Sequence, residues 1–403
     1  NNMIIINENK KRRLPTLSIA IMLSVCGISV SHAENIVADG AAPAGQQADI
    51  KIEPNISLSV LCSSIMNCGE TTTINIQSAD KNGLSHNKYT KFDIPHFQDV
   101  VILNNILSNE DNGNPNLVNS AAKIILNEVR SPQASLLNGS VALSGQNAHV
   151  IIANPSGIDC NGCSFTNMSH LTLTTGVPSF SLNNKLLNFR VIEGEISINR
   201  GVKDNSGLNH RMRGGDPAYL NLFSESVKIN GKLKADDVLI VAGKNRVKHV
   251  YPGQRMGISP LVAYLSIPDH FGSVDVGEMG GMYANRIRII SEGNITNNNE
   301  IHSKGAIQMV SGGNIENSLG GDITGGTLLL YSSGKVNNSK GVMMGVDANS
   351  KSTIKIKANS LVNTDGKVQA YGKRINVALN NPIENNFGDI SVIGGSTITR
   401  LKI

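Results

Sequence analysis

The sequence predicts an all-β protein built as a β-solenoid, with an N-terminal cap that closes the first turn. Its 403 residues include 40 Gly and no Trp, and aromatic residues make up only 4% of the chain. Such a composition, rich also in Asn, Ser and Thr, favours short strands joined by tight turns over long helices. Short apolar runs, several of them alternating, and a repeat near 20 residues complete the pattern.

The first 33 residues have the pattern of a secretory signal peptide. A basic stretch, Lys10 to Arg13, precedes the apolar run Leu17 to Val30, and Ser31-His32-Ala33 supplies the small-x-small spacing of a cleavage site. A membrane anchor is the alternative, but the apolar run is short for a bilayer span. We therefore expect an exported chain whose mature part begins after Ala33.

Four cysteines remain after such cleavage, and their even number in an exported chain predicts disulfides. Three pairings are possible; the local one, Cys62–Cys68 and Cys160–Cys163, is the simplest because each pair brackets a short turn. A redox site at Cys160-Asn161-Gly162-Cys163 would need a following helix, and a zinc site would need a second pair at matching spacing. Neither pattern is found, so a structural disulfide is favoured and no metal is expected.

The mature chain begins with a small, polar segment, residues 34–50, which we interpret as an extended lead-in. The irregular region 50–110 is the expected cap, because a solenoid must protect its first rung from edge-to-edge pairing. Further on, Ile196 and Ile198 alternate with polar residues, as expected of strands buried on one face. Other β-type runs are Thr71–Ile76, Val100–Leu103, Lys123–Val129, His149–Ala153 and Leu171–Thr174, and alternation recurs at Val227/Ile229, Ile287/Ile289 and Ile354/Ile356.

The second half of the chain repeats itself. Similar segments start at Gly293, Gly313 and Gly334, which are 20 and 21 residues apart, and a looser unit follows. A period near 20 with strands, Gly and Asn is typical of a β-solenoid in which each repeat forms one rung. A leucine-rich repeat would need a regular Leu frame that is missing. The last residues, ITRLKI, resemble a stop in the middle of a rung, which suggests a piece of a longer repeat protein.

Charge and motifs give little support for catalysis or nucleic-acid binding. The net charge of +5 is spread without a basic stripe. His86 and His149 stand alone in the sequence, so we expect surface or packing roles. Asp236 and Asp237 are neighbours that a strand would point to opposite faces. No nucleophile, zinc-protease or phosphate-loop motif is present. We therefore expect that the protein is not an enzyme and that it binds no cofactor.

Residues 70 to 290 resemble the secretion domain of two-partner secretion exoproteins, the filamentous-haemagglutinin, haemolysin and contact-dependent-inhibition proteins of Gram-negative bacteria. The motifs that carry the resemblance are GLSHNKYTKFDI (83–94), NPNL (114–117), AAKIILNEV (121–129), NPSGIDCNGCSFTN (154–167), LTLTTGVP (171–178), DDVLIVAGKN (236–245) and GGMYANRIRII (280–290).

The resemblance implies a right-handed parallel β-helix, with a secretion domain over 34–290 and haemagglutinin-type repeats over 291–403. It also implies export to the periplasm and then through an outer-membrane β-barrel partner that has periplasmic recognition domains. In the family, the partner requires the region of the two Asn-Pro motifs. Ser156 stands where the family usually has Asn, and its shorter side chain can make a similar turn bond. The residues that match the two motifs are Asn114, Pro115, Asn116 and Leu117, and Asn154, Pro155, Ser156, Gly157 and Ile158.

The resemblance further implies a secreted or cell-surface protein that acts as an adhesin or haemolysin, with a host-cell or bacterial surface receptor. Two alternatives remain: the N-terminal part of a contact-dependent growth-inhibition toxin, and a β-helical polysaccharide-acting enzyme. For the Asn-Pro motifs, both recognition by the transporter and a purely structural role remain open.

Overall fold

The computed structural model describes residues 34–54, 69–249, 256–261, 272–394 and 397–402. The predicted signal segment, residues 1–33, and the predicted Cys62–Cys68 pair lie outside these ranges. The chain divides into residues 1–34 and residues 35–403, and the described strands belong to the second unit.

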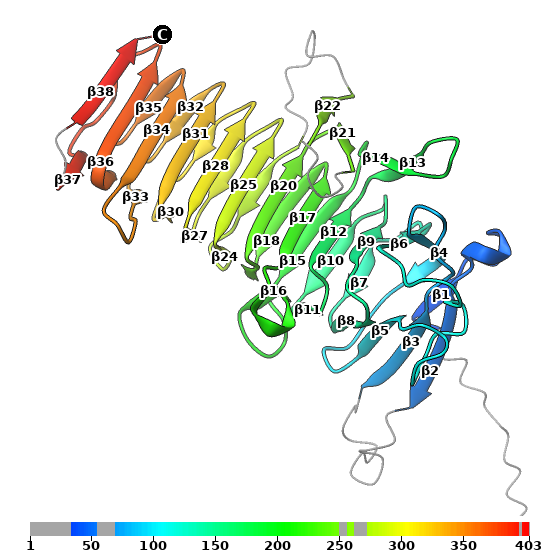
Figure 1. Cartoon of the computed structure of the whole chain (residues 1–403). Helices are drawn as coiled ribbons and strands as arrows, with labels where there is room; N and C mark the ends of the chain where they lie inside the picture. Colours follow the sequence, from blue (N-terminus) through cyan, green and yellow to red (C-terminus); the bar gives the residue numbers. More distant parts are fainter. Residues whose placement is uncertain (1–33, 55–68, 250–255, 262–271, 395–396, 403) are drawn as a thin grey trace, which may run out of the picture. The chain divides into compact units, whose positions relative to one another are not determined.

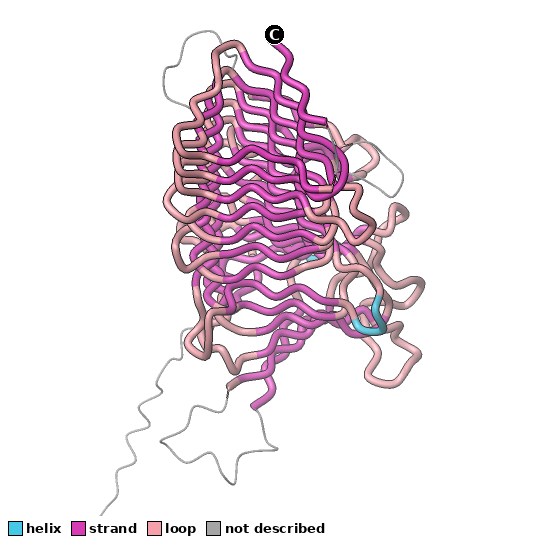
Figure 2. The backbone as a smooth tube through the Cα atoms, turned by 90° about the vertical axis from the view of Figure 1, so that its left-hand side faces the viewer, coloured by secondary structure: helices cyan, strands magenta, loops and turns pink. Residues whose placement is uncertain are grey.

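The described part of residues 35–403 forms a right-handed parallel β-helix, as the resemblance implies, with three strand faces around one core (Figure 1). The strands of successive rungs stack on one another (Figure 2). In each complete rung the chain passes through the three faces, called C, B and A below, in that order, as in β10, β11 and β12. Parallel strands pair in register from rung to rung, so each inward residue stacks on its equivalent below.

Face A contains β4 (Leu84–Phe92), β6 (Ile124–Val129), β9 (His149–Ala153), β12 (His170–Thr174), β17 (Tyr219–Ser224), β20 (Asp237–Ala242), β25 (Arg286–Ser291), β28 (Ala306–Ser311), β31 (Thr327–Ser332), β34 (Ser352–Ala358), the second half of β36 (Lys367–Leu379) and β38 (Thr397–Lys402). Face B contains β3 (Glu70–Asn75), β5 (Val100–Asn105), β8 (Ser140–Gly145), β11 (Cys163–Thr166), β16 (Ser206–Arg211), β19 (Lys232–Lys234), β24 (Gly281–Ala284), β27 (Glu300–Ser303), β30 (Asp322–Gly325), β33 (Val342–Gly345), the first half of β36 and β37 (Asp389–Ile393).

Face C is built from strands of two to five residues: β7 (Ser135–Leu137), β10 (Ile158–Asn161), β15 (Glu195–Asn199), β18 (Ser226–Asn230), β23 (Val274–Val276), β26 (Ile295–Asn297), β29 (Ile315–Glu316), β32 (Lys335–Asn337) and β35 (Ser360–Val362). The predicted repeat is confirmed here, because Ile295, Ile315, Val336 and Leu361 are aligned on consecutive rungs and are almost fully buried.

The cap differs from the prediction. Residues 34–50 are not a plain lead-in: β1 (Ile36–Ala38), the 3-10 turn η1 (Ala44–Gln46) and β2 (Asp49–Pro54) close the bottom of the helix. β1 pairs antiparallel with β4, and β2 pairs antiparallel with β3. β3 and β5 are already parallel rung strands, so much of the predicted cap region 50–110 belongs to the solenoid itself.

A second sheet lies outside the solenoid. It consists of β13 (Val177–Phe180), β14 (Leu186–Arg190), β21 (Asn245–Lys248) and β22 (Ile258–Pro260), all antiparallel, and we call it the extrahelical sheet. Its strands leave the solenoid after β12 and after β20. Phe189, Val191 and Val247 are buried against outward-facing apolar residues of face A. The sequence analysis did not predict this layer.

A second 3-10 turn, η3 (Arg213–Gly215), lies in the loop before β17. No helix in the described part of the chain is both long and apolar enough to cross a membrane.

Candidate functional site

The first Asn-Pro motif forms a tight turn between β5 and β6. The Leu117 backbone N–H donates to the Asn114 carbonyl at 3.0 Å, and the Asn116 N–H donates to Asn114 Oδ1 at 2.9 Å. Asn114 is fully buried, and its Nδ2 donates to the carbonyls of Ile76 and Asn104, each at 2.8 Å. Proline in the second position presets the turn.

The second motif, between β9 and β10, is built in the same way. The Gly157 N–H donates to the Asn154 carbonyl and the Ser156 N–H donates to Asn154 Oδ1, both at 3.0 Å. Asn154 is fully buried, and its Nδ2 donates to the Gln133 carbonyl at 3.1 Å and to Ser135 Oγ at 3.0 Å. The Ser156 hydroxyl donates to the Ser131 carbonyl, so serine does satisfy this turn in place of asparagine.

The two motifs therefore occupy two different corners of the prism. The first lies where face B meets face A, and the second where face A meets face C. Leu117 and Ile158 are core residues, and Gly157 is buried with a φ of 122° that disfavours a side chain. Of the predicted recognition residues, Pro115 and Ser156 are exposed, while Asn116 and Pro155 are half-buried.

Cys160 and Cys163 form the predicted disulfide, with Cα atoms 5.3 Å apart. The bond spans the corner between β10 and β11, and both residues are buried in the core. The Asn-Pro turn and the cysteine pair thus mark two successive corners, with one short strand between them. Between the cysteines, Asn161 donates from Nδ2 to Asn138 Oδ1 at 2.8 Å and accepts from Asn199 Nδ2 at 2.9 Å.

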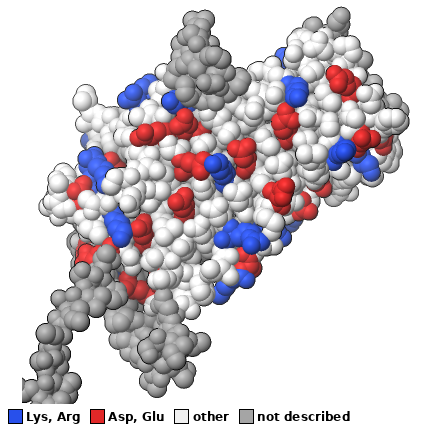
Figure 3. All heavy atoms as spheres, turned by 180° about the vertical axis from the view of Figure 1, so that it is seen from behind, with Lys and Arg blue, Asp and Glu red and all other residues white. Residues whose placement is uncertain are grey.

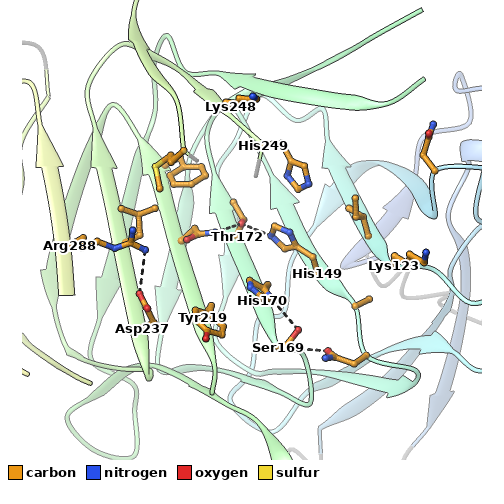
Figure 4. Close-up of a pocket in the computed structure, with 18 residues that line it drawn as sticks. Lys123, His149, Ser169, His170, Thr172, Tyr219, Asp237, Lys248, His249 and Arg288 are labelled. Carbon is orange, nitrogen blue, oxygen red and sulfur yellow. Dashed lines mark hydrogen bonds and ion pairs between the residues drawn. The ribbon is translucent and has the colours of Figure 1, made fainter. Parts of the chain in front are cut away.

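A pocket of about 700 Å³ opens on the outer surface of face A, beside the extrahelical sheet (Figure 4). Its floor is a row of side chains at matching positions on neighbouring strands: His149, His170, Tyr219 and Asp237. The rings of His170 and Tyr219 stack with centroids 4.6 Å apart, and the ring of His249 stacks on His149 at 5.2 Å. We call this the face A pocket.

His149 is therefore not the isolated histidine that the sequence suggests. Burial lowers its pKa well below the usual value, and His249 and His170 lower that pKa further. Burial also lowers the pKa of His249 to about 4, with Lys185 and His170 contributing. The pKa of His170 is lowered by burial, which Asp237 partly opposes. All three imidazoles are therefore neutral at pH 7.

His86 is not isolated either. It lies on face A beneath the extrahelical sheet, 7% exposed, with Nε2 2.6 Å from Glu128 Oε2 and its ring 5.3 Å from that of Phe180. Burial alone would raise the pKa of Glu128, but the hydrogen bond and charge of His86, aided by Arg130 and Lys88, lower it overall. This pair packs the hairpin of β13 and β14 onto the solenoid.

The neighbouring residues Asp236 and Asp237 bind different partners, as expected for residues that a strand points to opposite faces. Asp236 Oδ2 accepts from the Ala218 N–H at 2.7 Å, whereas Asp237 is bound by Arg286 Nε at 2.8 Å and by Arg288 Nη2 at 3.5 Å. Within the described ranges, no group of three or more His, Cys, Asp or Glu side chains is arranged to hold a metal ion. Charges of both signs are interspersed over the surface shown in Figure 3.

Comparisons with known proteins agree with the resemblance. Residues 62–323 match the family model described as the TPS secretion domain. The Toxin CdiA of Yersinia pestis is 34% identical over 300 residues, which are 71% of this chain and 8% of that protein. The 16S rRNA endonuclease CdiA of Enterobacter cloacae is 37% identical over 230 residues, 54% of this chain and 6% of that protein.

The chain thus spans less than a tenth of the length of these relatives. Among solved structures, the filamentous hemagglutinin secretion domain matches with a TM-score of 0.50 and 22% identity, over 92% of this chain and 100% of that one. At that identity the likeness shows the fold alone.

Proposed function

Because the chain belongs to the TPS secretion domain family, we propose that it directs export through an outer-membrane β-barrel transporter by means of periplasmic recognition domains on that partner. Exoproteins of this family are secreted or displayed at the cell surface after outer-membrane transport by a dedicated partner, and this chain follows that route. We propose in addition that periplasmic domains of the partner bind this chain, and that they bind it at the residues described next.

The observation that carries the proposal is the burial of the motif asparagines. Asn114 and Asn154 are fully buried, and their amides are bonded inside the fold. A transporter can therefore contact these two side chains only before the rungs close. In the folded domain it can contact Pro115 and Ser156 instead. We propose that the transporter binds this region of the chain before folding and that the turns then lock it.

Secretion with and without the cognate barrel tests this proposal, comparing the native chain with Asn154→Ala and Ser156→Asn. Removing the Asn154 amide leaves Ser135 and the Gln133 carbonyl without a partner and costs about 1–3 kcal/mol of folding free energy. Ser156→Asn restores the usual family residue and should leave secretion unchanged.

Melting curves of the purified variants separate the two roles of the motif. An Asn154→Ala chain that stays in the periplasm although it is still folded at the temperature of the secretion assay supports recognition before folding. Normal secretion, or a loss explained by instability alone, would make the motif a structural corner only. Equal export without the barrel would defeat the whole proposal.

For the intact protein, we propose first an adhesin or haemolysin acting on a surface receptor, and second the delivery of a C-terminal toxin in contact-dependent inhibition. The second is favoured by the relatives named Toxin CdiA and 16S rRNA endonuclease CdiA. A red-cell lysis and adhesion assay tests the first function. Growth competition between producing and non-producing bacteria tests the second.

We also propose that this region has no catalytic activity of its own. The support is the setting of the aspartate and the histidines of the face A pocket: Asp237 is bound in an ion pair, and His149, His170 and His249 are stacked on other rings. Incubation with polysaccharides, followed by measurement of released reducing ends, tests this; release would favour the β-helical enzyme alternative.

A further inference from the structure

The face A pocket has a floor that cannot bind a peptide by strand addition. β12, β17 and β20 are interior strands, each paired on both sides with parallel neighbours. Their backbone N–H and C=O groups are already used in the sheet. A ligand in this pocket must be recognised by side chains, which distinguishes the site from an open sheet edge.

The side chains on the floor offer hydroxyl and amide groups beside an apolar strip. Thr172 accepts from Asn221 Nδ2 at 3.1 Å and contacts His149 Nε2 at 2.7 Å, so these groups are fixed in position. Phe223 and Leu239 follow on the same face and are nearly buried. Fixed polar groups beside a flat apolar strip suit a sugar ring, which has hydroxyl groups at its edge and C–H groups on its faces.

The charges around the pocket favour a negative ligand. Lys123 lies at one end and Lys248 on the extrahelical sheet, and both are exposed. In the described part of the chain, neither ammonium group has a carboxylate within 4 Å. The carboxylate in the lining, Asp237, is already paired with Arg286 and Arg288. The pocket therefore carries an excess of positive charge.

We propose that the face A pocket binds an anionic sugar, a hydroxyl-rich ring bearing a carboxylate or a phosphate. The floor supplies the hydroxyl contacts, Phe223 and Leu239 supply the apolar contact, and the two lysines pair with the charged group. A neutral sugar would leave the lysines unused, and an apolar ligand would leave the polar floor without partners. The site is distinct from the two Asn-Pro turns, which lie at the corners of the prism.

Isothermal titration calorimetry of the full chain tests the proposal with three probes: trigalacturonate, mannose 6-phosphate and neutral maltotriose. The charged probes should bind, and at least one of them should bind about tenfold more tightly than maltotriose. The double variant Lys123→Gln/Lys248→Gln should weaken charged-probe binding about tenfold, because exposed ion pairs contribute modestly one by one. The relative strength of the two charged probes identifies the preferred group.

Two variants make the outcome decisive. Asn221→Asp adds one negative charge to the floor at almost constant volume. It also removes the amide that donates to Thr172, so it should weaken all three probes, and the charged probes more than maltotriose. Lys304→Gln/Lys357→Gln removes the same charge from exposed positions in the C-terminal half and should have no effect. Equal losses in both lysine pairs, or no binding of either charged probe at about 10 mM, would overturn the proposal.

Discussion

The two halves of the solenoid share one backbone plan but use the outer surface of face A differently. In β6 and β20, in the first half, every residue is buried, because the inward side chains pack in the core and the outward ones lie under the extrahelical sheet or around the pocket. In β28, in the second half, buried and half-buried residues alternate strictly. The first half is thus a layered structure, and the second is a simple prism.

The asparagine ladders show the same contrast at one corner, where face C meets face B. In the first half, Asn138, Asn161, Asn199 and Asn230 bond to one another at outward positions with solvent access. In the second half, Asn297, Asn317, Asn338 and Asn363 form a ladder one residue earlier, at the inward position, where all four are almost fully buried. The switch occurs around β23, where Gly277 follows the strand in place of an asparagine.

The regular rungs and the interrupted rungs thus lie in different halves of the chain. The second half repeats one rung, and its buried asparagine ladder fixes the register between rungs. The first half interrupts its rungs with hairpins, the disulfide and the histidine-lined pocket. Its irregular features are also where the family's motifs lie.

The largest expected effect breaks the inner ladder. Asn338→Leu removes the amide that donates to Asn363 Oδ1 at 2.7 Å and the oxygen that accepts from Asn317 at 2.8 Å. Because these partners are buried, we expect a loss of about 3 kcal/mol in the free energy of unfolding. The matched change in the outer ladder, Asn199→Leu, should cost less than about 1 kcal/mol, since water can replace its bonds. Denaturant unfolding of both variants measures the difference; equal losses would contradict the distinction between ladders.

A smaller effect separates the layered half from the prism. Phe189→Ala removes a side chain that is 1% exposed between the extrahelical sheet and Phe223. We expect a loss of about 2 kcal/mol, below the usual range for a core phenylalanine, because the added sheet can open locally. Hydrogen exchange should accelerate in β14 and β21 and stay unchanged in β28 and β31. Acceleration throughout the solenoid would mean that the extrahelical sheet is integral to the fold.

The smallest effect is a pH response of opposite sign in the two halves. His149, His170 and His249 have lowered pKa values, so their contribution to stability is complete above pH 6.5 and is lost as the pH falls below it. For His249, whose pKa is about 4, the loss extends down to that pH. Asp237 opposes this loss at His170, and Lys185 increases it at His249. In the second half, contact with Asp322 raises the pKa of His302, whose contribution is present at acid pH and is lost as pH rises.

Hydrogen exchange at pH 7 and pH 4.5, corrected for intrinsic rates, measures this response. Protection should fall in β9, β12 and β21 by about 1 kcal/mol at the lower pH, and hold in β27 and β30. A uniform change in both halves would contradict the assignment of the response to the histidine cluster.

Sequence reasoning predicts the solenoid well because its evidence is local and periodic. The repeat at Gly293, Gly313 and Gly334 places equivalent residues on consecutive rungs, and Ile295 and Ile315 do align. The disulfide between Cys160 and Cys163 follows from a short spacing. Such features depend on a few neighbouring residues, which a single sequence displays directly.

The extrahelical sheet and the pocket could not be predicted in the same way. β14 and β21 pair with each other, although two rungs of the solenoid, β15–β17 and β18–β20, lie between them in the sequence. No local sequence pattern predicts that contact. Two signals were nevertheless present. The unbroken apolar runs IIL (124–126) and VLIVA (238–242) indicate strands covered on both faces. His149 and His170 are one period apart, which aligns them on neighbouring strands.

The antiparallel cap gives the solenoid a direction of growth. β1 and β2 occupy the bottom edge, and each runs antiparallel to the rung strand that it pairs with, β4 and β3. A parallel rung that arrives at that end finds hydrogen-bonding groups in the wrong polarity, whereas the upper edge always offers the right one. Parallel rungs can therefore be added only at the upper edge, away from the cap. We expect the rungs to fold in the order of the sequence, each on the edge left by the rung before it.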